Sequence, residues 1–191
     1  MSSNPFQESA ILIISTIFSI YILAVMLRFI LQWARADFYN PLSQLLVKIT
    51  DPPLKPLRRI IPGWGGIDFA SILLMLALKF IELTLITLIK GISVSAGLLV
   101  ITALSELIGL AIMLFIGMII VSVILSWIGP GNQNPMVGLL HQATEPVLSP
   151  FRRIIPPIGG LDLSPIVAIV ALQIVKIFVD WSLNNLAAAV I

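Results

Sequence analysis

The chain reads Arg58-Arg59-Ile60-Ile61-Pro62 and, 94 residues further on, Arg152-Arg153-Ile154-Ile155-Pro156. The same offset relates other matched positions on either side of these two stretches. The other matches are an Asn-Pro pair, a Gly-Gly pair and an Asp: Asn40-Pro41 and Asn134-Pro135, Gly65-Gly66 and Gly159-Gly160, Asp68 and Asp162. A constant offset without a gap indicates a tandem duplication. The sequence therefore predicts two similar domains, residues 1–95 and residues 96–191.

The composition indicates a chain surrounded largely by lipid. Hydrophobic residues make up 59% and charged residues 10%, and the mean hydropathy is +1.09. Soluble domains carry about 25% charged residues, so this chain could not cover a water-facing surface. Cysteine is absent, which excludes disulfides, thiolate metal sites and cysteine nucleophiles. The net charge of +2 comes without a basic, aromatic-rich patch, so we expect no nucleic-acid partner.

Long apolar segments flank both copies of the repeated loop. A bilayer core needs about 20 apolar helical residues, and each segment is long enough. The four segments are Ala10 to Leu31, Ile67 to Ile89, Gly97 to Ile128 and Leu163 to Ile191. We therefore expect an all-α membrane protein with four transmembrane helices, the third long enough to tilt or to project into the interface. The first residues contain Glu8 and no Lys or Arg, unlike a cleavable signal peptide.

Basic residues predict the orientation in the membrane. They gather in the two predicted loops, 35–67 and 129–161, whereas the connection after the second span offers Lys90. Loops rich in Lys and Arg remain cytoplasmic. We therefore expect both loops on the cytoplasmic side of a bacterial inner membrane and both termini in the periplasm. The two halves then insert the same way up, as parallel repeats related by an axis along the membrane normal.

Each repeated loop is predicted to begin with an amphipathic helix. Asn40 and Asn134 are expected N-caps, because each precedes a Pro at the first helical position. Apolar residues follow at helical spacing: Leu42, Leu45, Leu46 and Ile49 in the first loop, and Met136, Leu139, Leu140 and Ala143 in the second. We expect both helices to lie in the headgroup layer. An acid before Pro, at Asp51-Pro52 and Glu145-Pro146, predicts a second helix start, and Pro56 and Pro150 should limit its length.

The end of each loop is predicted to be a turn back into the membrane. Gly65-Gly66 and Gly159-Gly160 supply backbone freedom, and Asp68 and Asp162 are expected to cap the following span. Neither Gly pair belongs to a phosphate loop, because no Gly-Lys-Ser/Thr sequence follows. In both loops the Asp lies ten residues after the first Arg of the pair, so a salt bridge could close the loop.

The two arginine pairs allow two interpretations. Arg58-Arg59 and Arg152-Arg153 would lie where anionic headgroups attract basic residues by about 1 kcal/mol each. The simpler interpretation, which we favour, is that they anchor the topology. The alternative is a docking site for anionic lipid or for a membrane-protein partner, and the recurrence of the surrounding prolines keeps it open.

Five charged residues interrupt the predicted spans: Lys79, Glu82, Glu106, Lys176 and Asp180. At about 1.5 Å per residue, Glu82, Glu106 and Lys176 reach similar depths. Unpaired, each would cost several kcal/mol in lipid. We therefore expect these three to meet between the repeats, with Lys79 or Asp180 nearby. A structural ion-pair cluster is favoured over a proton or ion relay, because no polar stripe continues along any span.

Three other features of the spans and loops are less specific. Arg28 lies near the cytoplasmic end of the first span and is expected to snorkel to the interface. Gly109 and Gly117 share one face of the third span, which fits either close helix packing or the general frequency of Gly in membranes. His141 is the single histidine, and one unpaired histidine is weak support for a haem ligand or a catalytic base.

The repeated residues resemble the YggT family, called YlmG in Gram-positive bacteria and plastids. The resemblance rests on Asn-Pro, acid-Pro, Arg-Arg-Ile-Ile-Pro, Gly-Gly and Asp in both copies and covers nearly the whole chain. It implies a small integral protein of the bacterial inner membrane, linked to osmotic-stress tolerance, to envelope or division processes and, in plastids, to cofactor assembly on a membrane cytochrome. The family brings no agreed catalytic activity and no active-site residues.

The sequence therefore favours a non-enzymatic membrane scaffold or assembly factor, with a membrane-protein partner or a second copy of itself. No nucleophile–base pair, metal-ligand spacing or acid dyad points to catalysis, a metal or a cofactor. The alternative is a small ion or solute channel or transporter formed at the repeat interface, and an enzyme comes third.

Overall fold

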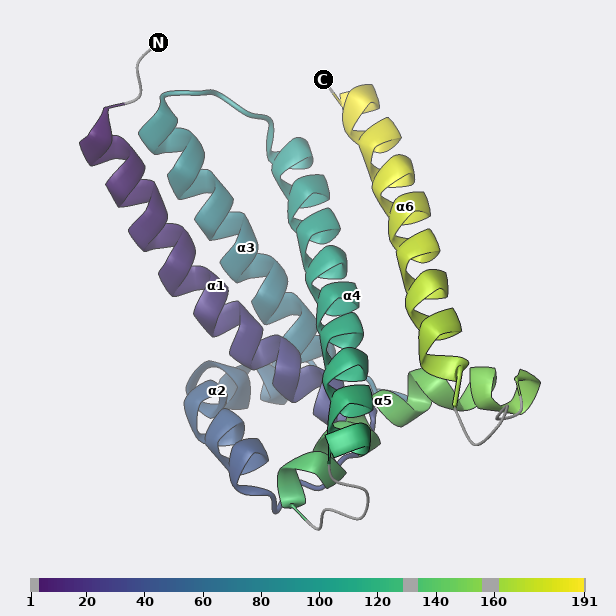
Figure 1. The fold of residues 1–191 in the computed structure, drawn as a ribbon. Coiled ribbons are helices and arrows are strands. Elements are labelled where there is room, and N and C mark those ends of the chain that lie inside the picture. Colours follow the sequence, from purple (N-terminus) through teal and green to yellow (C-terminus); the bar gives the residue numbers. More distant parts are fainter. Residues whose placement is uncertain (1–3, 129–133, 156–161, 191) are drawn as a thin grey trace.

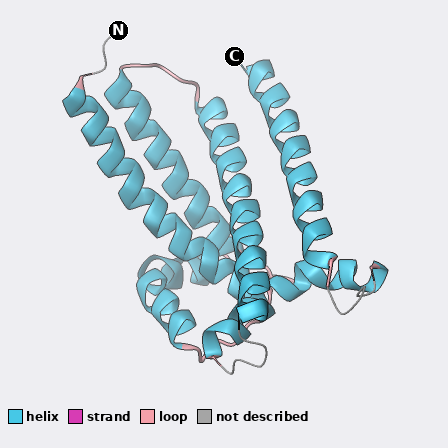
Figure 2. Ribbon diagram, viewed as in Figure 1, coloured by secondary structure: helices cyan, strands magenta, loops and turns pink. Residues whose placement is uncertain are grey.

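The chain folds into helices throughout the part that the computed structural model describes, residues 4–128, 134–155 and 162–190. Figure 2 shows helices joined by short loops, with no strand in these ranges and a single isolated bridge between Trp64 and Ile67. The helices are α1 (Pro5–Trp33), α2 (Pro41–Ile60), α3 (Phe69–Lys90), α4 (Ala96–Ile128), α5 (Pro135–Ile154) and α6 (Ser164–Val190).

Four of these helices, α1, α3, α4 and α6, are long and apolar enough to cross a membrane. This confirms the predicted number of spans. Among them, α3 packs on α1 and on α4, and α4 packs on α6. Both chain ends lie at one end of this row of helices, with α1 and α6 at its two sides (Figure 1). The first span begins at Pro5, earlier than predicted, because the Asn4 side chain caps it by accepting a hydrogen bond from the Phe6 amide (3.1 Å).

The shorter helices α2 and α5 lie across the end of the row that is remote from the chain ends (Figure 1). Each has 20 residues, and each begins at the Pro of an Asn-Pro pair. The Asn40 side chain accepts a hydrogen bond from the Leu42 amide (3.0 Å), and Asn134 accepts one from the Met136 amide (2.9 Å). Helix α2 packs on α1 and α3, whereas α5 packs on α4, α6 and α1.

The predicted second helix start after Asp51 and Glu145 is wrong, because α2 and α5 each continue through these residues. Helix α2 contains Pro52, Pro53 and Pro56 inside its bounds. An interior Pro costs about 3 kcal/mol through a lost hydrogen bond and a steric clash. Burial on both sides of the prolines offsets this cost, since Thr50 and Leu54 are fully buried against the bundle. Tertiary packing thus decides the length of the helix.

The apolar stripe of α2 is divided between the protein and its surroundings. Leu46 is buried beside Ser43 and Thr50, whereas Leu45 and Ile49 are exposed large apolar side chains. In α5, Leu139 and Ala143 are buried and Met136 is exposed. The buried face of each helix therefore lies one step round from the predicted stripe and includes small polar residues. The remaining apolar side chains are available to a hydrocarbon or headgroup environment.

The two glycines of α4 have different surroundings. A Cβ built at Gly109 would lie 3.8 Å from the Cε atom of Lys176 on α6, and one built at Gly117 would meet nothing within 4 Å. Gly109 thus lies beside a side chain from the neighbouring span. Gly117 has no such neighbour, so its presence needs no packing role, because glycine is generally frequent in membrane helices.

Candidate functional site

The first hairpin consists of α2 and the turn that leads into α3, and the second consists of α5 and the segment that leads into α6. A salt bridge closes the first hairpin by joining the end of α2 to the start of α3. The Arg58 guanidinium bonds to the Asp68 carboxylate through two nitrogens, with Nε at 3.1 Å from Oδ2. Arg58 also donates to the Gln32 side chain at the end of α1 (3.0 Å). Asp68 is 2% exposed and caps α3, because its side chain accepts a hydrogen bond from the Ser71 amide (3.4 Å) as well as one from Ser71 Oγ (2.6 Å). Left-handed Gly65 and Gly66 complete the turn before it, with φ of 62° and 84°.

The second hairpin contains the corresponding bridge in a more open setting. Arg152 Nε donates to Asp162 Oδ2 (3.0 Å), and Asp162 Oδ1 accepts from the Ser164 amide (2.9 Å). Arg152 also pairs with Glu145. The Asp162 side chain is 42% exposed, so this bridge is more accessible than the first. Gly159 and Gly160, the predicted turn residues, lie outside the described residues.

Competing effects set the acidity of the two capping carboxyls. Burial alone would raise the pKa of Asp68, but the hydrogen bonds from Arg58 and Ser71 outweigh burial and hold that pKa below its ordinary value. Burial also acts on Asp162, where the hydrogen bonds from Ser164 and Arg152 likewise lower the pKa. Both aspartates are therefore ionised at neutral pH and hold their arginines in place.

The second arginine of each pair behaves differently from the first. Arg59 and Arg153 are exposed, and neither has an ion pair with another described residue. Each is followed by a largely exposed isoleucine, Ile60 or Ile154. Both hairpins therefore present, at the end of their helix and beside an apolar side chain, a cation that has no ion pair among the described residues.

The position of Arg28 differs from the one predicted from the sequence. Arg28 was expected to snorkel to the interface, but it is 4% exposed and lies beneath α2. Its guanidinium donates to Thr50 Oγ1 (2.7 Å) and pairs with Asp51 (2.8 Å). The acid of the Asp51-Pro52 motif is thus a partner for α1, and it also pairs with Lys55 (3.0 Å). The one signal for this contact in the sequence is that Asp51 is an acid between the basic residues Lys48 and Lys55.

Three of the five charged span residues meet within the bundle. Lys79 Nζ on α3 lies 2.9 Å from Glu82 on the same helix and 2.7 Å from Glu106 on α4. Glu82 is 2% exposed. The sequence predicted that Lys176 would meet Glu82 and Glu106, with Lys79 or Asp180 nearby, but it is Lys79 that pairs with both carboxylates. This ion pair joins the first half of the chain to the second.

The other two charges form a pair of their own along α6. Lys176 Nζ lies 2.5 Å from Asp180 Oδ2, one helical turn away, and Ser105 Oγ of α4 lies 3.4 Å from Asp180. No ion pair joins Lys176 to Glu82 or Glu106 in the described part of the chain. Lys176 nevertheless lies close to Glu106, since both line one cavity of about 290 Å³ together with Lys79.

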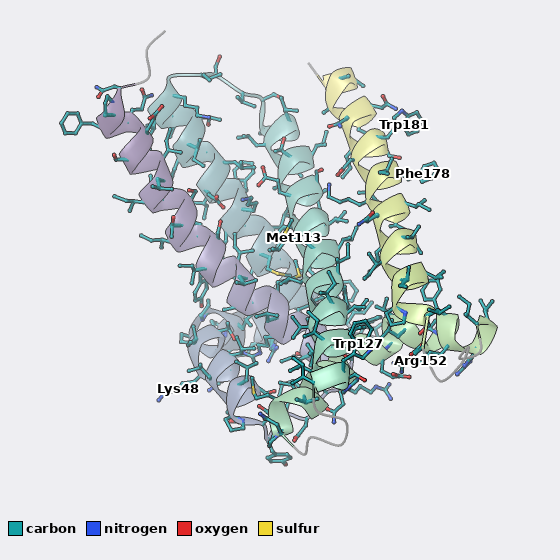
Figure 3. The ribbon with its side chains drawn as sticks, viewed as in Figure 1. Lys48, Met113, Trp127, Arg152, Phe178 and Trp181 are labelled. Carbon is teal, nitrogen blue, oxygen red and sulfur yellow. The ribbon has the colours of Figure 1, made fainter. Side chains whose placement is uncertain are left out.

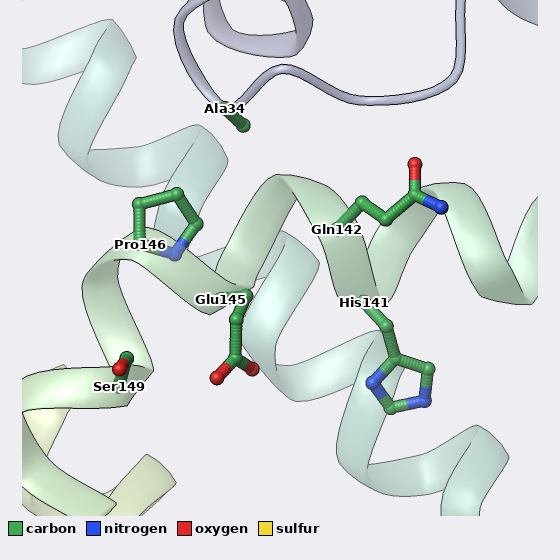
Figure 4. A pocket seen from close by; sticks show the side chains of 6 residues that line it. All are labelled: Ala34, His141, Gln142, Glu145, Pro146 and Ser149. Atoms are coloured by element: carbon green, nitrogen blue, oxygen red, sulfur yellow. The ribbon is translucent and has the colours of Figure 1, made fainter.

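A wider hollow of about 470 Å³ lies along α5 (Figure 4). His141, Glu145 and Ser149 follow one another at helical spacing along it, and Ala34 from the end of α1 faces them. His141 Nδ1 lies 3.3 Å from Ser122 Oγ, so the histidine has a structural contact with α4. Among the described residues, no group of three His, Cys, Asp or Glu side chains could hold a metal ion.

The salt bridges of the two hairpins are expected to contribute differently to the free energy of unfolding. Replacing Arg58 by Gln leaves the buried Asp68 carboxylate without its cation, which should lower the free energy of unfolding by about 1–3 kcal/mol. The matched change Arg152→Gln affects an exposed pair and should cost less than about 1 kcal/mol. Thermal unfolding of the detergent-purified variants measures both, and equal losses would contradict the assigned difference in burial.

The lowered pKa of Asp68 predicts an acid-sensitive contribution. Its stabilisation is fully present above the ordinary Asp pKa of about 3.9 and is lost as the pH falls through the lower pKa of the folded protein. The stability advantage of the unaltered chain over Asp68→Asn should therefore shrink below about pH 4. An advantage that stays constant between neutral and acid pH in unfolding experiments would show that the carboxylate charge is unimportant.

Removing the shared lysine should test the buried charge cluster. Lys79→Met leaves two carboxylates unpaired and should destabilise the purified protein by about 3–5 kcal/mol. Adding Glu82→Gln and Glu106→Gln should restore much of this loss. Lys176→Met serves as the matched control, since the Lys176–Asp180 pair is more exposed, and it should cost less. A triple variant no more stable than Lys79→Met would argue against the ion-pair assignment.

The model of the CCB3/YggT family matches the chain twice, at residues 7–89 and at residues 101–183. The Pseudomonas aeruginosa protein PA0392 is 48% identical over 184 residues, covering 95% of this chain and 92% of that protein. The YggT protein of Escherichia coli K12 is 39% identical over 168 residues, covering 86% of this chain and 85% of that protein.

A plant relative and the solved structures add less. The Arabidopsis thaliana protein named YlmG homolog protein 2, chloroplastic, is 42% identical over 55 residues, covering 29% of this chain and 22% of that protein. No solved structure matches the chain. The two family matches together span most of the sequence, in agreement with the resemblance of the repeated motifs. The chain therefore belongs to the CCB3/YggT family.

Proposed function

We propose that this chain is a non-enzymatic scaffold or assembly factor of the bacterial inner membrane. It consists of two parallel tandem repeats, each with two spans and a hairpin that carries an amphipathic helix. Both hairpins face the cytoplasm and both termini face the periplasm. Following the family resemblance, its role belongs to osmotic-stress tolerance and envelope processes, and it binds no cofactor or nucleic acid.

The repeat architecture is supported by the family match and by the helices. The two matched ranges begin 94 residues apart, at residues 7 and 101. Helices α2 and α5 also begin 94 residues apart and have the same length. The orientation is supported by the concentration of Lys and Arg at the α2 and α5 end of the bundle, which the positive-inside rule assigns to the cytoplasm.

The different surroundings of the two arginines in each pair carry the functional proposal. Arg58 and Arg152 are held by carboxylates of their own hairpins. Arg59 and Arg153 are exposed and have no carboxylate partner in the described part of the chain, so their charge is available to an acidic group outside the chain. Lys48 also projects away from α2 (Figure 3). A cation beside an exposed isoleucine suits either an anionic headgroup or an acidic, partly apolar protein surface.

A second candidate function, a small ion or solute conductor, is favoured by one observation. The cavity of about 290 Å³ between the spans is lined by Lys79, Glu106 and Lys176. Charged side chains inside a membrane mark ion pathways as well as structural pairs. We rank this function second because the charges of Lys79 and Lys176 are each engaged by neighbouring carboxylates.

The scaffold proposal predicts different effects for adjacent arginines. The double change Arg59→Gln with Arg153→Gln should abolish photo-crosslinks between residue 60 or 154 and a discrete membrane partner, while leaving thermal stability unchanged. The matched variant Arg152→Gln should keep these crosslinks, because its guanidinium is engaged within the hairpin. Crosslinking in native membranes measures both variants. If both variants keep the crosslinked partner, docking through the exposed arginines is contradicted.

Purified protein in liposomes separates the two candidate functions. The scaffold proposal predicts no ion current or tracer flux above that of empty liposomes. Flux that falls when Glu106 is changed to Gln would instead establish the conductor and overturn the ranking.

A further inference from the structure

Helices α1 and α6 form the two outer sides of the bundle (Figure 1). Helices α3 and α6 occupy corresponding places in the two halves, as do α1 and α4, because the family model matches both halves at a constant offset. Within the chain, α3 of the first half packs on α4 of the second. Its counterpart α6 packs on α4 of its own half and lies at the far side of the row from α1 (Figure 1).

The face of α4 that contacts the first half has an exposed counterpart on α1. Leu107 is 8% exposed, and Ala111 and Leu114 pack against the core of the first half. The residues 94 positions earlier are Ile13, Ile17 and Ile20, which are 60%, 62% and 63% exposed. The sequence has thus kept a large apolar stripe on α1 at the positions that form a helix interface on α4.

The corresponding face of α6 carries a polar side chain. Lys79, which joins α3 to Glu106 of α4, corresponds to Gln173. Gln173 is exposed, lies in the middle of α6 and has no side-chain hydrogen bond in the described part of the chain. Amide side chains of membrane helices commonly bond across helix interfaces, because hydrocarbon offers them no partner.

The face of α1 that would meet Gln173 offers an exposed hydroxyl group. Around Lys79, the cavity between the spans is lined by Gly109, Leu110 and Met113 of α4. The corresponding residues of α1 are Ser15, Thr16 and Ser19. Ser19 lines that cavity within the same chain, and Ser15 is half-buried and donates to the Leu12 carbonyl, whereas Thr16 is exposed. An α6–α1 contact built like the α3–α4 contact would therefore place the Gln173 amide opposite the Thr16 hydroxyl.

We propose that α6 of one copy of this chain packs on α1 of a second copy, in the way that α3 packs on α4 within each copy. The interface is head-to-tail, since different surfaces of the two copies meet. It repeats, between two molecules, the interface that joins the two halves within one molecule. Gln173 of one copy lies beside Thr16 of the other, and α6 covers the stripe of Ile13, Ile17 and Ile20. The proposal rests on the repeat architecture and is independent of the docking role of Arg59 and Arg153.

Crosslinking of introduced cysteines tests the proposal directly, because the chain has no cysteine of its own. Leu12 corresponds to Glu106, so copies carrying Leu12→Cys and Gln173→Cys are co-expressed with different tags. A short thiol-reactive crosslinker is applied to native membranes, since a Lys–Glu pair spans a wider gap than a disulfide. The readout is the yield of dimer carrying both tags.

A matched control comes from the opposite side of α6. Val175 is exposed, lies two residues from Gln173 and is rotated by about 200° around the helix. The proposal predicts a severalfold higher dimer yield for Leu12→Cys with Gln173→Cys than for Leu12→Cys with Val175→Cys. It also predicts that Gln173→Leu, added to the copy carrying Leu12→Cys, leaves the yield unchanged, because that copy contributes its α1 to the trapped contact.

Three results would overturn the proposal. They are equal yields from Gln173→Cys and Val175→Cys, no mixed dimer at all, or a dimer from Gln173→Cys alone as strong as the mixed one. The last result would mean a symmetric α6–α6 contact. The substituted positions are exposed, so folding of each variant is checked by its unchanged thermal unfolding. Repeating the crosslink with Arg59→Gln and Arg153→Gln in both copies should give the same yield, which separates this interface from the docking proposal.

Discussion

Hydrocarbon can neither solvate a charge nor hydrogen-bond a polar group, and this constraint governs how the charged residues of the chain are arranged. Where a charge falls within a span, the fold supplies its partner: Lys79 bonds to Glu82 and Glu106, and Lys176 bonds to Asp180. At the end of the spans, the buried Arg28 donates to Thr50 and pairs with Asp51 of α2. Two of these ion pairs join different helices, because Lys79–Glu106 links α3 to α4 and Arg28–Asp51 links α1 to α2.

The two halves use one sequence pattern but solve the pairing problem differently. In the first half, the acid of the acid-Pro motif, Asp51, pairs with Arg28 of the preceding span. The second half has Ser122 at the position that corresponds to Arg28. Its acid, Glu145, forms an ion pair with Arg152 of the same hairpin instead. Ser122 lies against His141, which replaces a valine of the first half. Both hairpins thus have an Arg–Asp bridge, whereas their contacts with the preceding span differ.

Local patterns in the sequence were sufficient to predict the number of spans, the Asn-Pro helix starts and the ten-residue spacing of the Arg–Asp bridges. These features depend on composition and on short-range geometry. The continuous course of α2 through three prolines could not be predicted, because packing of Thr50 and Leu54 outweighs the local preference of Pro. The partner of Glu106 was also missed: depth along a helix is readable from a sequence, but rotation about its axis, which brings Lys79 rather than Lys176 into contact, is not. The different environments of Arg58 and Arg59 depend on the same kind of three-dimensional information.

In the proposed topology, both hairpins lie on the same, cytoplasmic side of a bilayer, as parallel repeats require. Single cysteines at the corresponding positions Lys48 and Gln142, and at Ser93 in the opposite connection, allow a direct measurement with a membrane-impermeant thiol reagent on intact cells. The account predicts labelling of Ser93→Cys alone, with Lys48→Cys and Gln142→Cys labelled only after the membrane is opened. Labelling of Lys48→Cys and Gln142→Cys from opposite sides would contradict it.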